Sequence, residues 1–210
     1  MTKMILVRHC QAEGNLKRYF QGRIDTDITP QGAKQAAQTA ELLSTEPIDA
    51  IYSSPKLRAM KTAQAINIFH EMEIITDDRL VEINAGKWEG VLLTDIERLY
   101  PEQWDNWKNA PSVFCAPGGE SMREVYDRVK PALLDIADKN RVKTVCVVSH
   151  GCAIMNMMCF LHGYGVEDIK KITLGPNASV NVIEFDDALV PSVIIDGYAE
   201  HLQTGSSIDF

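Results

Sequence analysis

Two histidines directly follow apolar stretches of this chain, where they could do chemistry together. His9 follows the apolar residues 4–7 and Arg8, and His150 ends a second such stretch, residues 143–150. Both stretches are typical of strands buried in a parallel sheet. Ligands of such sheets bind beyond the carboxyl ends of the strands. If the two strands are neighbours, both imidazoles lie at one edge of the sheet.

Two arginines are expected at the same edge. Arg8 precedes His9, and Arg58 lies near the start of a helix that follows another predicted strand, residues 48–54. Two guanidiniums and two imidazoles would be costly to bring together without an anion. A phosphoryl group carries about two negative charges at neutral pH, and its oxygens match the planar guanidinium fork. These side chains therefore predict a phosphate pocket.

The histidines indicate a reaction as well as binding. An imidazole nitrogen placed against phosphorus can act as a nucleophile and form a covalent phosphoenzyme. The leaving oxygen then needs a proton from a nearby acid. Glu82, which has apolar neighbours and follows a predicted strand at residues 73–77, is the candidate. Each residue alone also has a structural explanation, such as a surface cation or a solvated carboxylate, so the prediction depends on their joint placement.

The elements that must position these side chains alternate along the chain. Besides the strands above, strands are expected at 178–185 and 190–198, and helices at 30–43, 54–71, 121–140 and 152–163. Thr29 and Pro30 are a typical cap and first residue for a helix. The alternation predicts an α/β fold, a three-layer α/β/α sandwich with a mostly parallel central sheet. We expect residues 1–210 to form a single domain.

Residues 79–121 interrupt this alternation with short helical stretches, turns and aromatic residues. Such an irregular excursion predicts an insertion that covers the site. Its tryptophans, Trp88, Trp104 and Trp107, either line an apolar pocket for the substrate or pack the insertion onto the core, and packing is the simpler interpretation. Of the three, Trp88 is the best candidate for the site because it lies nearest to Glu82 in the sequence.

The segment PGGES, residues 117–121, has two interpretations. Ser121 and Glu124 can form a capping box for the following helix, which is the preferred interpretation. Glu120 could instead face the site as a second acid.

Composition limits the partners of the protein. The formal net charge is −8, which argues against nucleic acid and acidic membrane surfaces and leaves a small phosphorylated metabolite. No apolar stretch approaches the ~18 residues that span a bilayer. The five cysteines are odd in number and irregularly spaced, so a reducing, cytoplasmic location is expected. A homodimer is compatible with the sequence, which does not decide the oligomeric state.

Five motifs resemble those of the histidine phosphatase superfamily, the phosphoglycerate mutase-like group. They are LVRHCQAEGN, FQGRIDTDITPQG, IYSSPKLRAMKTA, LVEINAGKWEG and VVSHG, and together they span most of the chain. The resemblance implies that His9 becomes phosphohistidine and that Glu82 protonates the leaving oxygen and then activates water. It assigns the phosphoryl group to Arg8, Asn15, Arg58 and His150, and the substrate side to Gln21 and Gly22. It implies no metal and no other cofactor.

Residues 83–90, directly after Glu82, and residues 100–121 resemble the phosphatase branch, which includes α-ribazole phosphatases and broad-specificity phosphatases. The expected function is therefore metal-independent hydrolysis of a phosphomonoester. A cofactor-dependent phosphoglycerate mutase and a catalytically weak phospho-ligand-binding protein stay open as alternatives. Cys10 replaces the family's glycine, which puts catalytic efficiency in question. Cys10 and Cys152 could also form a redox pair, with nearby cations lowering the thiol pKa.

Overall fold

The computed structural model describes residues 1–204 and contains a six-stranded sheet in the order β3-β2-β4-β1-β5-β6. The strands are β1 (Thr2–Arg8), β2 (Ile48–Ser53), β3 (Ile74–Thr76), β4 (Thr144–Ser149), β5 (Val180–Phe185) and β6 (Pro191–Tyr198). The first four strands run parallel, while β5 and β6 are antiparallel to their neighbours. The predicted α/β fold with a mostly parallel sheet is confirmed.

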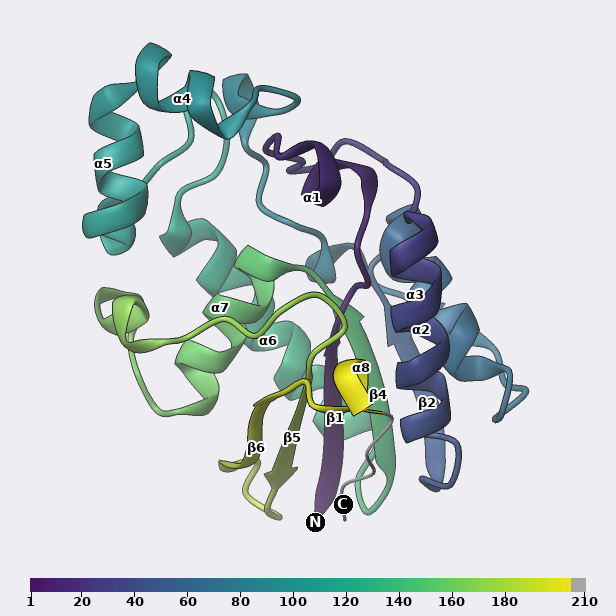
Figure 1. Cartoon of the computed structure of the whole chain (residues 1–210). Coiled ribbons are helices and arrows are strands. Elements are labelled where there is room, and N and C mark those ends of the chain that lie inside the picture. The colour runs from purple at the N-terminus through teal and green to yellow at the C-terminus, as the bar shows by residue number, and fades with distance from the viewer. Residues whose placement is uncertain (205–210) are drawn as a thin grey trace.

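Helices cover both faces of the sheet (Figure 1). They are α1 (Glu13–Lys17), α2 (Pro30–Leu42), α3 (Leu57–Asn67), α4 (Leu93–Leu99), α5 (Pro101–Asn109), α6 (Met122–Lys139), α7 (Gly151–Leu161) and α8 (His201–Thr204). Helices α2 and α3 lie on one face and α6 and α7 on the other. Helices α1, α4 and α5 stand beyond the carboxyl ends of the parallel strands (Figure 1). None of the helices among residues 1–204 is long and apolar enough to cross a membrane.

Strand β1 divides its side chains between two hydrophobic cores. Met4 and Leu6 belong to the large core beneath α6 and α7, whereas Ile5 and Val7 belong to the core beneath α3. All four side chains are fully buried. Successive side chains of a strand point to opposite faces, so a continuously apolar strand needs cover on both. Each such side chain stabilises the fold by roughly 1.5–3 kcal/mol, which makes β1 a rigid support for the residues that follow it.

The helix boundaries follow from local hydrogen bonds. Thr29 Oγ1 accepts a hydrogen bond from Gly32 N at 2.9 Å, so α2 begins as predicted. Helix α3 begins at Leu57, later than expected, because the backbone N–H of Ser54 still donates to Val148 O of the neighbouring strand β4. The chain can turn into the helix only after this last sheet hydrogen bond.

Candidate active site

Strands β1 and β4 are adjacent and parallel, and their register brings His9 and His150 together. Arg8 pairs with Ser149, so the next residue of each strand is a histidine. His9 N donates to Ser149 O at 2.9 Å. The two imidazole centroids lie 5.1 Å apart, with the ring planes at 55°. The prediction that both rings meet at one edge of the sheet is confirmed.

A cavity of about 250 Å³ opens at this edge. Seven of the predicted site residues line it: Arg8, His9, Asn15, Gln21, Gly22, Arg58 and Glu82. His150 is fully buried directly behind His9. The structure therefore gathers residues that are up to 142 positions apart, from Arg8 to His150, around one small space.

The hydrogen bond of His9 selects one tautomer of its ring. Nδ1 lies 2.7 Å from Cys10 O, and a carbonyl oxygen can only accept, so Nδ1 carries the proton. Nε2 is left with its lone pair. Burial, followed by the positive charges of Arg58 and Arg8, holds the pKa of His9 well below its ordinary value. The ring is therefore neutral near pH 7, as a nucleophile must be.

His150 has one buried ring nitrogen without a hydrogen-bond partner in the described part of the chain. Its Nε2 is hydrogen-bonded to Ser54 Oγ at 2.7 Å, whereas its buried Nδ1 has no partner among residues 1–204. Burial, followed by Arg58 and His9, also holds the pKa of His150 well below its ordinary value. A buried polar atom without a partner is costly, and an oxygen of a bound anion would satisfy it.

The two arginines carry buried positive charge. Arg58, 1% exposed, donates from Nη1 to Ile24 O and from Nη2 to Gly22 O, each at 2.8 Å. Arg8 donates from Nη1 to Gly175 O at 2.6 Å. The Nε atoms of both are buried and have no partner among the described residues. Burial lowers the pKa of both guanidiniums, and Glu82 partly opposes this. An anion in the cavity would offset the cost of burying these charges.

Glu82 is held by backbone amides at the start of α7. Its Oε1 accepts from Ile83 N at 2.9 Å and from Ala153 N at 3.1 Å, and its Oε2 accepts from Cys152 N at 3.1 Å. These contacts aim the carboxyl group at the cavity that it lines. Each carboxyl oxygen has two lone pairs. Oε2, which accepts one of these bonds, therefore keeps a free lone pair.

The amide and glycine positions around the cavity are also set by the backbone. Asn15 Oδ1 accepts from Ala12 N at 2.9 Å, so the amide nitrogen is its remaining polar group toward the cavity. Gly22 has φ of +50°, and a Cβ there would collide with the carboxylate of Glu89. Only glycine suits this turn, which directs the Gly22 carbonyl at Arg58.

The prediction that Trp88 lines the substrate pocket is wrong. Trp88 is 0% exposed, and its ring centroid lies 4.9 Å from that of Phe114 inside an aromatic cluster. A short 3-10 turn, Gly86–Trp88, directs the ring into the core. Trp104 and Trp107 line the cavity instead. They are three residues apart on α5 and therefore share one face of it, a signal that the sequence contains.

Several other lining residues have no signature in the local sequence. Tyr19, Phe20, Leu93, Met155 and Leu174 form much of the remaining wall. Nothing in their local sequence marks them, since they come from loops and helices that only tertiary packing brings to the cavity.

The suggestion that Glu120 faces the substrate is also wrong. Its carboxylate is in an ion pair with Arg128, Nε to Oε1 at 3.0 Å, and accepts from Asn84 N at 2.7 Å, away from the cavity. Burial acts to raise the pKa of Glu120, but these hydrogen bonds outweigh it and hold the pKa below its ordinary value. The preferred interpretation of Ser121 is confirmed, because it forms the capping box with Glu124.

The two cysteines considered as a redox pair lie in different cores. Cys10 packs with Ala36 and Ala178, and its sulfur accepts from Thr62 Oγ1 at 3.1 Å. Cys152 belongs to the core beneath α6 and α7. Burial raises the pKa of both thiols, so the expectation that cations lower it is wrong. The side chain of Cys10 turns toward α3, which explains how the chain accommodates it where the family has glycine.

Paired imidazoles and guanidiniums at the carboxyl edge of an α/β sheet have the charge and the donors to hold a phosphoryl group. The sequence model of the histidine phosphatase superfamily (branch 1) matches residues 4–191. The chain therefore belongs to this superfamily.

Relatives with known names or structures cover nearly the whole chain. Phosphoserine phosphatase 1 of Hydrogenobacter thermophilus is 39% identical over 188 residues, which are 89% of this chain and 88% of that protein. The structure of YhfR from Bacillus stearothermophilus has a TM-score of 0.92 at 28% identity and covers 97% of this chain and 100% of that one. A phosphoserine phosphatase variant from Entamoeba histolytica, solved with phosphoserine, has a TM-score of 0.85 at 28% identity and covers 96% and 100%.

The neutral buried histidines should make stability depend on pH. An ordinary histidine has a pKa of about 6.5, so below this pH the unfolded chain binds protons that folded His9 and His150 do not. We therefore expect the free energy of unfolding to fall as the pH drops below 6.5, by up to about 1.4 kcal/mol per pH unit for each ring. Urea unfolding between pH 7 and pH 5 measures it. In the variant His150→Gln, the slope of the free energy of unfolding against pH should be smaller than in the wild type, because one fewer ring binds a proton on unfolding. Equal slopes in the two proteins would contradict the prediction.

Proposed function

We propose that this protein is a metal-independent phosphomonoester hydrolase that works through a phosphohistidine intermediate on His9. The observation that carries the proposal is the orientation of the His9 ring. The bond from Nδ1 to Cys10 O leaves the neutral Nε2 as the nucleophile at a cavity lined by Arg8 and Arg58. Fixed cations of this kind stabilise the charge that spreads over the phosphoryl oxygens in the transition state.

The proposed reaction has two steps. In the first, His9 Nε2 bonds to phosphorus, the bond from phosphorus to the ester oxygen breaks, and Glu82 gives its proton to the departing alcohol. In the second, water attacks the phosphohistidine, its proton passes to Glu82, and the bond from phosphorus to Nε2 breaks. Phosphate leaves, and His9 and Glu82 return to their starting states.

The wall of the cavity supports a hydrolase over a mutase. Beyond the phosphoryl-binding residues the wall is largely apolar, and it includes Leu93, Trp104, Trp107, Met155 and Leu174. The carboxylate of a phosphoglycerate would find no cation in this part of the wall. The lining favours an ester whose alcohol has an apolar part. Phosphoserine, named for two of the relatives above, carries a carboxylate and an ammonium group, so it is the comparison substrate that tests this preference.

The proposal is tested with p-nitrophenyl phosphate, benzyl phosphate and phosphoserine. We expect phosphate release that is unchanged by a chelator such as EDTA, together with a phosphoryl label on the protein that is stable to base and labile to acid. A protein that releases no phosphate from any of the three would be a binding protein instead. Transfer to a phosphoglycerate acceptor in place of water would favour the mutase.

A further inference from the structure

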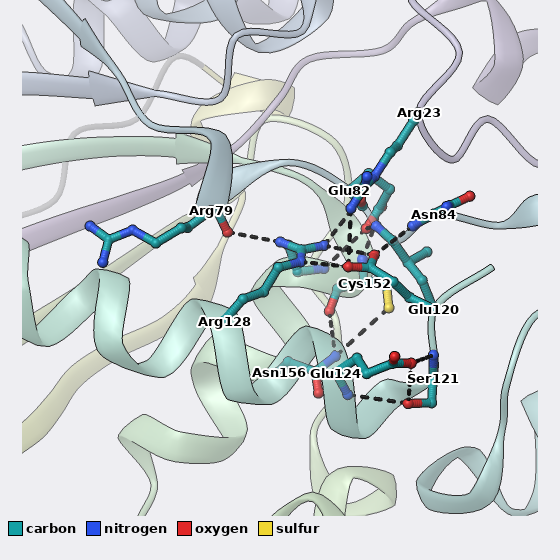
Figure 2. Close-up of polar contacts among 12 residues, drawn as sticks. Arg23, Arg79, Glu82, Asn84, Glu120, Ser121, Glu124, Arg128, Cys152 and Asn156 are labelled. Atoms are coloured by element: carbon teal, nitrogen blue, oxygen red, sulfur yellow. Dashed lines mark hydrogen bonds and ion pairs between the residues drawn. The ribbon is translucent and has the colours of Figure 1, made fainter.

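A half-buried ion pair stands behind the segment that carries Glu82 (Figure 2). Arg128 of α6 and Glu120 meet with Nε and Oε1 at 3.0 Å, and their side chains are only 16% and 17% exposed. Arg128 Nη2 adds a second bond, to Glu120 Oε2 at 3.2 Å. Neither residue lines the cavity, so the pair does not touch a substrate there.

The remaining donors of Arg128 bind the backbone that leads to Glu82. Nη1 donates to Arg79 O at 2.8 Å, and Nη2 donates to Glu82 O at 3.1 Å (Figure 2). All three nitrogens of the guanidinium are thus engaged. The planar fork of an arginine can serve a carboxylate and two carbonyls at once, which the compact ammonium of lysine cannot.

Glu120 binds the same segment on the other side of Glu82. Its Oε2 accepts from Asn84 N at 2.7 Å, and its own backbone N donates to Asn84 O at 2.8 Å. The ion pair therefore holds the chain before, at and after Glu82. The side chain of Glu82 is held separately by the backbone amides of Cys152 and Ala153. Those bonds form only if the Glu82 backbone stays at a fixed distance from α7.

Glu120 also reaches the loop on the substrate side. Arg23 Nη2 donates to Glu120 Oε1 at 3.0 Å. Arg23 directly follows Gln21 and Gly22, which line the cavity. One carboxylate thus connects the segment of the proposed acid with the loop that faces the substrate.

We propose that Arg128, through its pair with Glu120, is the positioning residue for Glu82 in proton transfer to the leaving group. This inference rests on the proposed function. Arg128 takes no part in bonding to the phosphoryl group; it sets where the carboxyl of Glu82 stands relative to the ester oxygen. Catalytic groups act only from a narrow range of positions, so a small shift of this backbone should be costly.

Two substrates of similar size separate this role from a general loss of structure. In the first step, benzyl phosphate releases a strongly basic alkoxide and needs the acid, whereas p-nitrophenyl phosphate releases a weakly basic phenolate and hardly needs it. The quantity to compare is therefore kcat/KM, which reports this step and not the later hydrolysis of the phosphohistidine, where Glu82 activates water for both substrates. We expect Arg128→Gln to lower kcat/KM on benzyl phosphate by about 10- to 100-fold, and on p-nitrophenyl phosphate by less than about threefold. Arg128→Lys should restore little of the loss, because the fork and not the charge makes the contacts.

A double-mutant cycle tests whether Arg128 acts through Glu82. In a Glu82→Gln background, Arg128→Gln should cost almost nothing further on benzyl phosphate, since the acid is already absent. Arg123→Gln is the matched control, because Arg123 lies on the same helix and pairs with Glu167 at the surface, away from Glu82. This control should leave both rates unchanged. Glu120→Gln, which keeps the side-chain shape, provides a second variant with the same expected substrate difference if Arg128→Gln folds poorly.

The outcomes separate this inference from the proposed function. Equal losses of kcat/KM on both substrates, or additive losses in the double mutant, would overturn the positioning role while leaving the hydrolase intact. A wild-type protein that releases phosphate from none of the three esters, phosphoserine included, would overturn the proposed function itself, and the positioning role with it.

Discussion

Replacing His9 by alanine should reduce phosphate release to the background rate. Nε2 of His9 is the nitrogen that can attack phosphorus: its lone pair is free because Nδ1 donates to Cys10 O, and the ring lines the cavity. Without it, no phosphohistidine can form, and water alone must attack the ester. Release of phosphate from p-nitrophenyl phosphate and the acid-labile protein label should both disappear.

The control for this variant is His162→Ala. His162 lies at the surface, where its Nε2 pairs with Asp196 at 2.9 Å, and its loss should leave turnover unchanged. His9→Ala should still bind phosphate, since Arg8 and Arg58 are intact, and phosphate should raise its midpoint of thermal unfolding. A His9→Ala protein that keeps near-normal turnover would show that the nucleophile lies elsewhere.

The second large effect is expected for Arg58→Lys. The guanidinium of Arg58 is held by Gly22 O and Ile24 O, which leaves its buried Nε for an anion. An ammonium keeps the charge but cannot make these contacts together. Loss of one such donor typically costs about 2.7–4 kcal/mol, or on the order of 10²–10³ in kcat. Steady-state kinetics on p-nitrophenyl phosphate measures the loss.

Arg141→Lys is the same substitution at a place without a role in the site. Arg141 lies at the surface and pairs with Asp138 at 2.7 Å, so its kcat should equal that of the wild type. If Arg58→Lys lowered only the stability, kcat would recover at a lower temperature, where the variant is fully folded. Wild-type turnover of folded Arg58→Lys would mean that this guanidinium does not contact the reacting group.

The local sequence predicts the site residues that lie at the carboxyl ends of strands. A continuously apolar stretch that ends in polar residues marks a buried parallel strand, and parallel strands deliver their last residues to one edge. The pattern of the chain therefore places His9, Arg8 and His150 at one edge of the sheet, on the condition that their strands are neighbours, which the pairing of β1 with β4 fulfils. Arg58 follows from the same logic, since it lies in the first turn of the helix after β2 at that edge.

Only the tertiary structure decided which residues of the irregular segments face the cavity. Trp88 is close to Glu82 in the sequence but packs against Phe114, while Trp104 and Trp107 line the wall. Glu120 does not face the substrate but pairs with Arg128 of the helix α6 that it precedes. In a turn or short helix no fixed period assigns a side chain to a face, so its direction depends on what packs against it.

The same limit applies to the fine geometry of the reacting groups. The sequence by itself determined the family's residues, the α/β fold and the edge where they meet, because periodic patterns encode strands and helices directly. Only the tertiary structure shows three details of the site. They are the tautomer of His9, the backbone amides of α7 that bind Glu82, and the hydrogen bonds from Arg128 to the carbonyl oxygens of residues 79 and 82. The contacts of Glu82 and Arg128 join residues that are 46 to 71 positions apart, and the contact of His9 depends on the local backbone angles. The pattern of apolar and polar residues along the chain predicts neither.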